Sequence, residues 1–506
     1  MSLTLSLLLR GVDGAVVTGG GSISGGADVI VNEVRDDSRL VQPGDLFVAA
    51  PGPVLDGRKF IADAAKRGAA VVVTEGAAPT GFAGVLVMVP NARLALGLIA
   101  ANRFGAANAL TLHAITGTNG KTTTTYLVEG MLAAAGRVPG VIGTVAYRSA
   151  APGFAPIEAT NTTPGALKIQ SVFAGMRAAG TTDVVLEATS QALAQGRLEG
   201  CTFRVAALTN VTQDHLDFHG TMESYFDAKA ILFERMLDPA RGVAVVFVDK
   251  EEGRRMRARC PRPAATLGVA CRPRVPGADV VVEHVNMDAG GIRATFTTPA
   301  GRLNVASPLV GEFNLENLAI AVGMGVAAGL PLDSIASGLS GAAGAPGRLE
   351  RVVNDRGVLC VVDYAHTPDA LERAIAAVRP YVRGKLIAVF GCGGDRDTSK
   401  RPIMGRIASS GADLSIATSD NPRTEDPDAI IDMIVPGLEA GQGRWHRERD
   451  RRAAIAYAVE SAEEGDVVLI AGKGHEDYQI LGTTKIHFDD REEAAAAFAR
   501  ARRAEP

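Results

Sequence analysis

Short apolar runs of Val, Ile, Leu and Ala recur along the chain between Ala-rich stretches of helical period. Within these runs the apolar residues follow one another without polar alternation, which is typical of parallel strands that helices bury on both faces. The pattern predicts strands over residues 70–74, 112–116, 184–187, 205–209, 243–248, 360–363, 386–390 and 467–471. Several runs end in Gly, Asp, Glu or Asn, and open α/β sheets place ligand-binding loops beyond the carboxyl ends of their strands. We therefore expect an α/β fold with its chemistry just after the strands.

The length of the chain and its loop-forming stretches predict several domains. A sequence of 506 residues is too long for one hydrophobic core, and about three domains are usual at this length. The Gly- and Ala-rich stretch 340–347 is the best candidate for a linker. We expect domains over residues 1–108, 109–345 and 346–506, the second of which opens with a strand and a phosphate-loop motif.

The charge and cysteine content exclude several classes of protein. The net charge is −4 and the 21% of charged residues mix both signs, so no basic surface for nucleic acid is expected. The five cysteines are odd in number and include no CxxC pair, which argues against disulfides or zinc and favours a reducing cytoplasm. The apolar start at residues 3–9 is too short to span a bilayer and lacks a basic segment before it, so we expect neither export nor a membrane partner.

A glycine-rich segment after the strand 112–116 predicts a site for nucleotide phosphates. It reads Gly117, Thr118, Asn119, Gly120, Lys121, Thr122 and Thr123, and a helical pattern follows. In this setting backbone N–H groups and the helix N-terminus hold phosphate oxygens, the lysine adds positive charge, and a threonine can ligate Mg²⁺. The spacing departs from GxxxxGK[ST], because Ile115 stands where the first glycine is usual. ATP with Mg²⁺ is the expected ligand, and a plain Gly-rich turn is the alternative.

Further motifs follow in a fixed order along nearly the whole chain. They lie at residues 37–39, 43–47, 56–57, 161–164, 187–190, 195–197, 209–217, 311–317, 347–350, 363–368, 391–397, 420–423 and 471–476. In this order they resemble the motifs of the Mur ligases, which build the peptide stem of the bacterial cell wall. The resemblance implies an N-terminal UDP-binding domain, a central P-loop NTPase-like parallel sheet that binds ATP, and a C-terminal Rossmann-like domain that binds an amino acid.

The resemblance also assigns residues to ligands. It implies contacts with the UDP-sugar-peptide substrate at Ser38, Pro53, Val54, Leu55, Asn161, Thr162, Thr163, Thr189, Ser190, Gln195 and Arg197. It implies that ATP also contacts Asn317, Arg348 and Asp363. It implies Mg²⁺ ligands at Thr122, Glu187, His215 and Lys229, and catalytic roles for Lys121, Glu187, His215 and Lys229.

Two of these positions need comment. Lys229 matches the lysine that the family carbamylates with CO₂, although by itself it reads as a solvated helix lysine. The family usually reads Glu-x-Ser-Ser-His where this chain has a glutamine, Gln191, at the last position. An amide cannot carry a proton, so no acid–base role is expected there, whereas the expected metal site is unaffected.

The C-terminal motif Asp420, Asn421, Pro422 and Arg423 resembles that of family members which take meso-diaminopimelate. Diaminopimelate differs from lysine by a carboxylate at its far end, which Arg396 and Arg423 could bind through paired hydrogen bonds. Lysine would leave these guanidinium groups unpaired, and a missing charged partner can support discrimination of about 10⁴-fold. Gly472 and Glu476 complete the expected site, with Glu476 paired to the distal ammonium group.

The expected function is therefore the ATP-dependent joining of meso-diaminopimelate to UDP-N-acetylmuramoyl-L-alanyl-D-glutamate through an acyl phosphate. We expect a cytoplasmic monomer that acts in the synthesis of peptidoglycan precursors. The alternatives are a lysine-adding Mur ligase, a folylpolyglutamate synthase and, from a different class, a non-catalytic ATP-binding switch.

Overall fold

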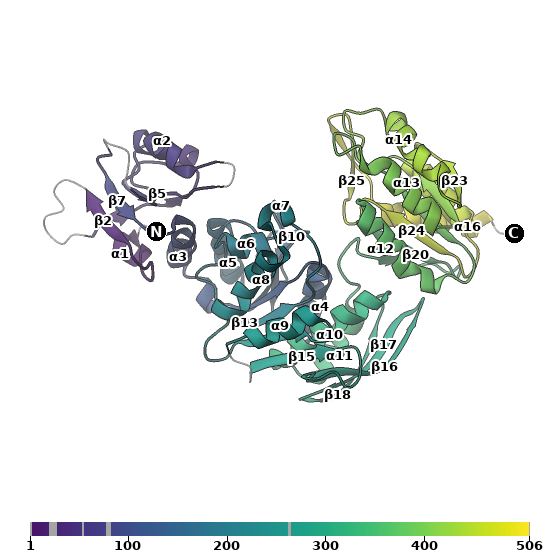
Figure 1. Cartoon of the computed structure of the whole chain (residues 1–506), viewed down its shortest axis with the longest axis horizontal. Coiled ribbons are helices and arrows are strands. Elements are labelled where there is room, and N and C mark those ends of the chain that lie inside the picture. Colours follow the sequence, from purple (N-terminus) through teal and green to yellow (C-terminus); the bar gives the residue numbers. More distant parts are fainter. Residues whose placement is uncertain (1–2, 20–27, 53–54, 77–81, 262–264, 505–506) are drawn as a thin grey trace. The chain divides into compact units, whose positions relative to one another are not determined.

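The structure is a computed structural model that describes residues 3–19, 28–52, 55–76, 82–261 and 265–504 (Figure 1). The described chain divides into two compact units. The first contains residues 1–281, 297–301 and 319–338, and the second contains residues 282–296, 302–318 and 339–506. Pro53 and Val54, which were expected to touch the nucleotide, lie outside the described residues.

The first unit begins with a five-stranded sheet of order β2-β7-β6-β5-β4. Its strands are β2 (Val16–Gly19), β4 (Val34–Arg35), β5 (Leu46–Ala49), β6 (Val71–Thr74) and β7 (Val85–Met88). Strands β4 to β7 are parallel, and helices cover both faces, as an unbroken apolar run requires. The covering helices are α1 (Leu5–Leu8), α2 (Ile61–Lys66) and α3 (Ala92–Phe104), and a two-stranded ribbon pairs β1 (Leu3–Thr4) with β3 (Ile30–Val31).

Helix α3 shows how the sequence sets the bounds of an element. The Asn91 side chain accepts hydrogen bonds from the backbone N–H groups of Arg93 and Leu94, which begins the helix. Gly105 follows the last residue with φ +60°, a left-handed conformation that glycine adopts without strain, and this ends the helix.

A second sheet has eleven strands in the described part of the chain, in the order β11-β10-β9-β12-β8-β13-β14-β15-β16-β17-β18. Its strands are β8 (Thr111–Thr116), β9 (Pro139–Ile142), β10 (Ala146–Ser149), β11 (Ile157–Glu158), β12 (Asp183–Glu187), β13 (Phe203–Leu208), β14 (Val243–Phe247), β15 (Thr266–Ala270), β16 (Val280–Asp288), β17 (Gly291–Thr298) and β18 (Gly301–Ser307). Strands β9, β12, β8, β13, β14 and β15 are parallel, so the ends of β8, β12 and β13 meet at one edge.

Helices follow β8, β12, β13 and β14 directly, and others follow the strands at the two edges of this sheet. They are α4 (Lys121–Ala134), α5 (Ala166–Ala179), α6 (Ser190–Ala194), α7 (Leu216–His219), α8 (Met222–Arg235), α9 (Glu251–Arg259), α10 (Glu312–Ala327) and α11 (Leu332–Gly341). Helix α5 buries Ile169, Phe173 and Met176 at helical spacing against the sheet.

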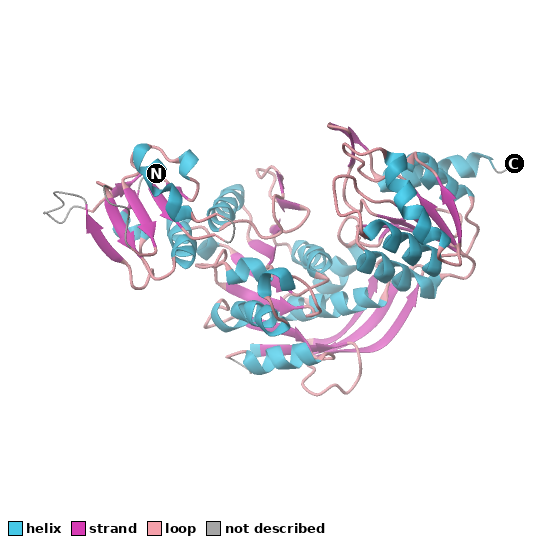
Figure 2. Cartoon of the chain, turned by 45° about the horizontal axis from the view of Figure 1, so that its top comes forward, coloured by secondary structure: helices cyan, strands magenta, loops and turns pink. Residues whose placement is uncertain are grey.

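The second unit contains a six-stranded sheet of order β19-β20-β24-β21-β22-β23. Its strands are β19 (Glu350–Val352), β20 (Leu359–Asp363), β21 (Leu386–Phe390), β22 (Leu414–Ala417), β23 (Arg444–Arg447) and β24 (Val467–Ala471), of which only β19 is antiparallel to its neighbour. A hairpin pairs β25 (Tyr478–Leu481) with β26 (Thr484–His487). Helices α12 (Pro368–Val378), α13 (Lys400–Gly411) and α14 (Pro427–Glu439) pack on one face, and α15 (Arg451–Glu460) and α16 (Asp490–Ala504) pack on the other (Figure 2).

These sheets confirm the α/β fold class and the strands expected from the apolar runs. The runs at 386–390 and 467–471 coincide with β21 and β24, and the others differ from the observed strands by at most two residues at an end. The expected boundaries near residues 108 and 345 fall just before β8 and β19, and their positions stay a prediction.

Candidate active site

The glycine-rich segment joins β8 to helix α4, as the sequence predicts. Gly117 has φ +143°, and a Cβ atom there would collide with the hydroxyl oxygen of Thr209. Gly120 has φ +84° directly before the helix. Both positions therefore require glycine, and the loop turns tightly enough to bring its backbone N–H groups to the N-terminus of α4.

The end of strand β13 holds this loop in place. The backbone N–H of Thr118 donates to the Asn210 carbonyl at 2.9 Å, and the N–H of Asn119 donates to the Asn210 side chain at 3.0 Å. The Thr209 hydroxyl donates to the carbonyl of Asn119 at 2.6 Å. The Lys121 ammonium group donates to the carbonyls of Gly117 and Thr118 at 3.0 and 2.9 Å, so its charge lies over the loop.

Glu187 is the last residue of β12, and its carboxylate lies beside the start of α4. The residue is 1% exposed. Its Oε2 atom accepts hydrogen bonds from the hydroxyls of Thr122 and Thr144 at 2.9 and 3.1 Å, and its Oε1 atom accepts the Thr144 backbone N–H at 2.9 Å. A buried carboxylate and a threonine hydroxyl of the phosphate loop are thereby brought together. Thr144 was not predicted, because nothing in its sequence neighbourhood marks a ligand.

Lys229 on helix α8 is buried, with 1% of its surface exposed. Its Nζ atom lies 4.2 Å from the centre of the Tyr225 ring, and no residue that the structure describes forms a hydrogen bond or an ion pair with it. Burial, together with the charge of Lys121, lowers the pKa of Lys229 well below its ordinary value. Tyr225 in turn lies 3.1 Å from the Thr118 hydroxyl through its own hydroxyl, which connects α8 to the phosphate loop.

His215 precedes helix α7 and has φ +50°, an uncommon left-handed conformation for a residue with a side chain. Its Nε2 atom lies 3.6 Å from a carboxylate oxygen of Asp214, and both side chains are 45% exposed. His219, which the sequence did not single out, pairs with the Ser190 hydroxyl at 2.9 Å and packs on the Tyr225 ring. Ser190 was expected to contact substrate, so His219 belongs to the same cluster.

A second group of predicted residues surrounds the start of helix α6. The Thr163 hydroxyl donates to the Glu187 carbonyl at 2.6 Å and accepts the backbone N–H of Thr189 at 3.1 Å. Arg197 donates to the Thr163 carbonyl at 2.7 Å and to the side chain of Gln195. Asn161 and Thr162 join the group as well. The hydroxyl of Tyr147 donates to the Asn161 carbonyl at 2.6 Å, and the hydroxyls of Thr162 and Thr144 lie 3.2 Å apart.

A cavity of about 260 Å³ within the first unit connects this group to the five-stranded sheet. Its lining includes Gln195 and Arg197 from the α6 region, Asp36 and Gly52 from the loops that follow β4 and β5, and Arg93 from helix α3. Ser38 and Leu55, also expected at the nucleotide, are not among its lining residues. Ser38 is buried, and Leu55 is exposed.

In the second unit, two of the residues expected to bind ATP lie close together. The Asp363 carboxylate at the end of β20 accepts the Leu349 backbone N–H at 2.8 Å, and burial raises its pKa. The Arg348 guanidinium group lies 5.3 Å from the centre of the Tyr364 ring. Asn317 is buried and donates to the side chain of Asn314 at 3.0 Å.

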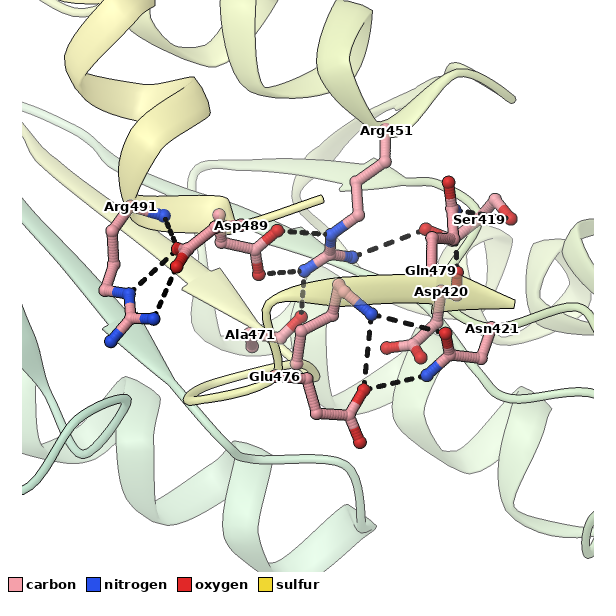
Figure 3. A network of polar contacts seen from close by, with 11 residues as sticks. Ser419, Asp420, Asn421, Arg451, Ala471, Glu476, Gln479, Asp489 and Arg491 are labelled. Carbon is pink, nitrogen blue, oxygen red and sulfur yellow. Dashed lines mark hydrogen bonds and ion pairs between the residues drawn. The ribbon is translucent and has the colours of Figure 1, made fainter. Parts of the chain in front are cut away.

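The residues expected to bind diaminopimelate follow β21, β22 and β24, and Figure 3 shows Asp420, Asn421 and Glu476 among them. Asn421 donates from its side-chain amide to Glu476 at 2.8 Å, and its carbonyl oxygen accepts the Ile480 backbone N–H at 2.9 Å. Lys473, fully buried, donates to Glu476 at 3.2 Å and to Asn421 at 3.3 Å. It lies inside the motif 471–476, but no role was expected for it. Gly472 has φ +122°, and a Cβ atom there would lie 2.5 Å from an Asp420 carboxylate oxygen.

Arg396 and Arg423 are differently placed. Arg423, which follows Pro422 and has φ +52°, donates to the Gly394 carbonyl at 2.8 Å, and Arg396 donates to the Asp395 carbonyl at 3.2 Å. Within the described ranges neither guanidinium group forms an ion pair with a carboxylate. Both therefore keep hydrogen-bond donors for an anionic ligand.

Three family models match the chain in succession. Residues 30–103 match the Mur ligase family catalytic domain, residues 115–325 match the Mur ligase middle domain, and residues 347–474 match the Mur ligase glutamate ligase domain. Together they cover most of the sequence. The chain belongs to the Mur ligase family.

Individual relatives narrow the comparison. A UDP-N-acetylmuramoyl-L-alanyl-D-glutamate–2,6-diaminopimelate ligase from Gloeobacter violaceus is 49% identical over 94% of this chain and 95% of its own length. A protein of the same name from Synechococcus elongatus is 47% identical over 93% and 95%. A solved structure that also carries this name aligns with a TM-score of 0.71 at 35% identity, over 93% of this chain and 95% of that one. A MurF structure from Acinetobacter baumannii aligns with a TM-score of 0.60 at 19% identity, over 94% of this chain and 96% of that one. This likeness shows the fold alone.

Two further observations concern metals and membranes. No three His, Cys, Asp or Glu side chains in the described residues gather closely enough to form a metal site by themselves. Among the helices that the structure describes, none combines the length and the apolar character needed to cross a bilayer.

Proposed function

We propose that this chain is an ATP-dependent ligase that joins meso-diaminopimelate to UDP-N-acetylmuramoyl-L-alanyl-D-glutamate, through an acyl phosphate, in the synthesis of peptidoglycan precursors. The observation that carries the proposal is the hydrogen bond between Thr122 of the phosphate loop and the buried carboxylate of Glu187. It unites the expected nucleotide site with the expected metal site in this chain's own residues. Relatives that are 44–49% identical over more than nine-tenths of the chain bear the name of this activity.

The phosphate loop supplies the groups that would bind ATP. The phosphate oxygens would accept hydrogen bonds from N–H and hydroxyl groups of the loop, at Gly117, Thr118, Asn119, Gly120, Thr122 and Thr123. Lys121 already points across the loop and would exchange its carbonyl partners for the β- and γ-phosphates. Asn317 would contact the adenine base, Asp363 the ribose and Arg348 the phosphates.

The side chains around Glu187 fit a magnesium ion. Mg²⁺ prefers oxygen ligands, and it is commonly bound by one or two carboxylates together with substrate phosphates. Thr122 and Glu187 offer such oxygens 2.9 Å apart, so a dedicated cluster of acidic residues is not required. His215 and a modified Lys229 would complete the set. When bound, the ion would neutralise charge that develops on the phosphoryl group.

Lys229 has the properties of an amine that reacts with CO₂. An ammonium group that is buried without a hydrogen-bonding partner is costly, and its lowered pKa favours the neutral, nucleophilic amine. Attack of the amine on CO₂ forms an N–C bond and releases one proton, which leaves a carbamate with two oxygens. The modified side chain would resemble a carboxylate, as a magnesium ligand requires.

The sugar-peptide substrate would bind between the α6 region and the first sheet. Gln195 and Arg197 line the cavity there, and Asn161, Thr162, Thr163, Thr189 and Ser190 lie next to Glu187. This placement would bring the D-glutamyl carboxylate toward the phosphate loop. Ser38, Pro53, Val54 and Leu55 would contact the nucleotide.

The amino-acid site would read both ends of diaminopimelate. Arg396 and Arg423 would bind the distal carboxylate, and Glu476, oriented by Asn421, would accept the distal ammonium group. Asp420, Pro422 and Gly472 would shape the pocket. Lysine lacks the distal carboxylate and would leave the two guanidinium groups unpaired, which is the basis for its rejection.

The reaction then follows in two displacements. The D-glutamyl side-chain carboxylate attacks the γ-phosphorus of ATP, the bond to the bridging oxygen breaks, and ADP leaves. The deprotonated amine of diaminopimelate attacks the acyl carbon, the carbon–oxygen bond to phosphate breaks, and the nitrogen loses its second proton as the amide forms. Lys121 stabilises negative charge during the first step, and the binding residues supply the orientation.

A panel of acceptors tests this function. Phosphate release from ATP is measured with the muramyl dipeptide and, in parallel, diaminopimelate, lysine or glutamate, with Lys121→Ala as the inactive control. We expect release with diaminopimelate at least 100-fold above the other acceptors. Preference for lysine or glutamate would assign the lysine-adding or folate-type activity, and no release with any acceptor would support an ATP-binding switch. We further propose that the protein acts as a cytoplasmic monomer and has no nucleic-acid or membrane partner.

A further inference from the structure

The second unit contains an ion pair that is completely buried. Arg451 is the first residue of α15, Asp490 is the first residue of α16, and both side chains are 0% exposed. The guanidinium group donates to both carboxylate oxygens at 2.7 and 2.6 Å. Although burial opposes it, the charge and hydrogen bonds of Asp490 raise the pKa of Arg451.

Arg451 also contacts the two strands that lead into the amino-acid site. It donates to the Ala471 carbonyl at 3.0 Å and to the Ser419 carbonyl at 3.4 Å (Figure 3). Ala471 is the last residue of β24 and directly precedes Gly472. Ser419 lies two residues beyond β22 and directly precedes Asp420. One guanidinium group therefore connects the ends of two strands that are not neighbours in the sheet.

Stability is a poor explanation for such a pair. Two desolvated charges cost several kcal/mol each, and well-packed apolar residues of similar volume often stabilise a protein equally well or better. Apolar side chains could not, however, donate hydrogen bonds to two carbonyl groups. The pair thus supplies an arrangement of the strand ends that a hydrophobic contact would leave unspecified.

Other hydrogen bonds connect the segments 419–421 and 471–476 to each other, but Arg451 connects them to the helices. The Gln479 side chain donates to the Asp420 carbonyl at 2.7 Å, and Lys473 connects Asn421 to Glu476. These bonds join the segments 419–421 and 471–476 to each other and to β25. Arg451 is the group that joins both segments to the helices α15 and α16.

We propose that Arg451 and Asp490 are positioning residues for the amino-acid site, fixing the segments 419–423 and 471–476 in the geometry that distinguishes diaminopimelate from lysine. The inference rests on the proposed function, since it concerns the acceptor that this site binds. Neither residue touches the acceptor. Misplacement of binding groups by about 1 Å can cost 10²-fold in rate, so small shifts of the strand ends have measurable effects.

The test replaces the pair by apolar residues in the full-length chain, as Arg451→Met with Asp490→Leu. We expect this variant to fold, with an unfolding midpoint near that of the wild type. Its KM for diaminopimelate should rise at least 10-fold and its preference over lysine should fall by a similar factor, while the KM for ATP changes less than 2-fold. Hydrogen exchange should increase in segments 419–423 and 471–476.

The same two helices provide a matched control. Arg452 and Glu493 form an equally short two-point ion pair, at 2.8 and 2.7 Å, but the Arg452 side chain is 58% exposed and the pair contacts neither segment. Arg452→Met with Glu493→Leu should leave both KM values and the exchange pattern unchanged. Arg451→Lys provides a second variant that keeps the buried charge opposite Asp490, and it too should raise the KM for diaminopimelate, because an ammonium group lacks the planar fork.

The outcomes separate the two proposals. A wild-type chain that does not use diaminopimelate contradicts the proposed function. A wild type that uses it, with an unchanged KM and unchanged exchange in a folded apolar variant, contradicts the positioning role alone. Equal losses in the Arg452–Glu493 control would likewise show that the buried pair has no special role. If the apolar variant does not fold, the Arg451→Lys result decides.

Discussion

Two buried lysines occupy opposite kinds of environment in the two units. Lys473 is fully buried and donates to Asn421 and Glu476, so its charge is neutralised within the protein. Lys229 is equally buried, but its Nζ atom lies over the face of Tyr225, and burial and the charge of Lys121 outweigh the opposing charge of Asp214, so that its pKa falls well below the ordinary value. One lysine has a carboxylate and an amide as hydrogen-bond partners, whereas burial disfavours the charged form of the other. Burial alone therefore does not distinguish a structural lysine from a reactive one.

The largest effect expected from this contrast is on catalysis. Lys229→Ala removes the amine that would carry the carbamate, and we expect the rate of phosphate release to fall at least about 10³-fold, since a lost ligand misplaces the phosphoryl group. Short carboxylic acids such as acetate or propionate should restore part of the activity by occupying the vacated space. The measurement is kcat with and without millimolar acid.

Lys473→Ala is the matched control for that rescue. It removes an equally buried lysine, yet acetate should not restore activity, because no carboxylate is missing there. Rescue of both variants, or of neither, would remove the distinction between the two lysines.

The next largest effect should be on the free energy of unfolding, which the two lysine replacements should change in different directions. Lys473→Met leaves Glu476 without its cation, and breaking a buried pair costs about 3 kcal/mol of unfolding free energy. Lys229→Met removes an unpaired amine at nearly constant volume, so its unfolding free energy should stay the same or rise. Denaturant titration of both variants measures the difference, and equal losses would contradict it. Lys485→Met tests for a general effect of removing a lysine. Lys485 also lies over a tyrosine ring, that of Tyr478, but it is exposed, so its replacement should change the unfolding free energy little.

The sequence predicts the fold better than it predicts the surroundings of these two lysines. The fold class, the strands and the phosphate loop follow from apolar runs and from glycines whose positive φ values tolerate no side chain. Lys229 is singled out by resemblance, although Tyr225, Leu232 and Phe233 lie three or four residues away on helix α8 and place it on the apolar face that the structure buries. The pair Arg451–Asp490 joins residues 39 positions apart, so tertiary contacts decide it. Strands β17 and β18 alternate buried and exposed residues instead of forming the unbroken apolar runs from which the other strands were predicted.

Arg396 and Arg423 resemble Lys229 in one respect, because within the described residues neither guanidinium group has a carboxylate partner. Within the described part of the chain the Arg423 guanidinium group donates to the carbonyls of Gly394 and Asn421 and to no carboxylate, and we propose the distal carboxylate of diaminopimelate as its charged partner. Arg423→Ala should raise the KM for diaminopimelate on the order of 100-fold, about 2.7 kcal/mol, with little change for ATP. Steady-state kinetics with each substrate varied in turn measures this, and equal KM values in variant and wild type would place the selectivity elsewhere. Arg235→Ala, which breaks an exposed ion pair with Glu199, serves as the control.

The smallest effect concerns pH and a neighbour of Lys473. Burial, followed by the charges of Arg348 and Arg491, lowers the pKa of His475 to about 4 from its usual 6.5. Between these two pH values the histidine binds a proton in the unfolded chain but not in the folded chain. Its contribution to the unfolding free energy is therefore complete above pH 6.5 and is lost as the pH falls toward 4. After allowance for solvent screening, we expect this group to contribute about 2 kcal/mol to that decline. His475→Gln should show a flatter stability profile over this range in chemical denaturation at several pH values. A profile parallel to that of the wild type would mean that His475 is protonated normally in the folded chain, and that the region around Lys473 is more hydrated than its burial indicates.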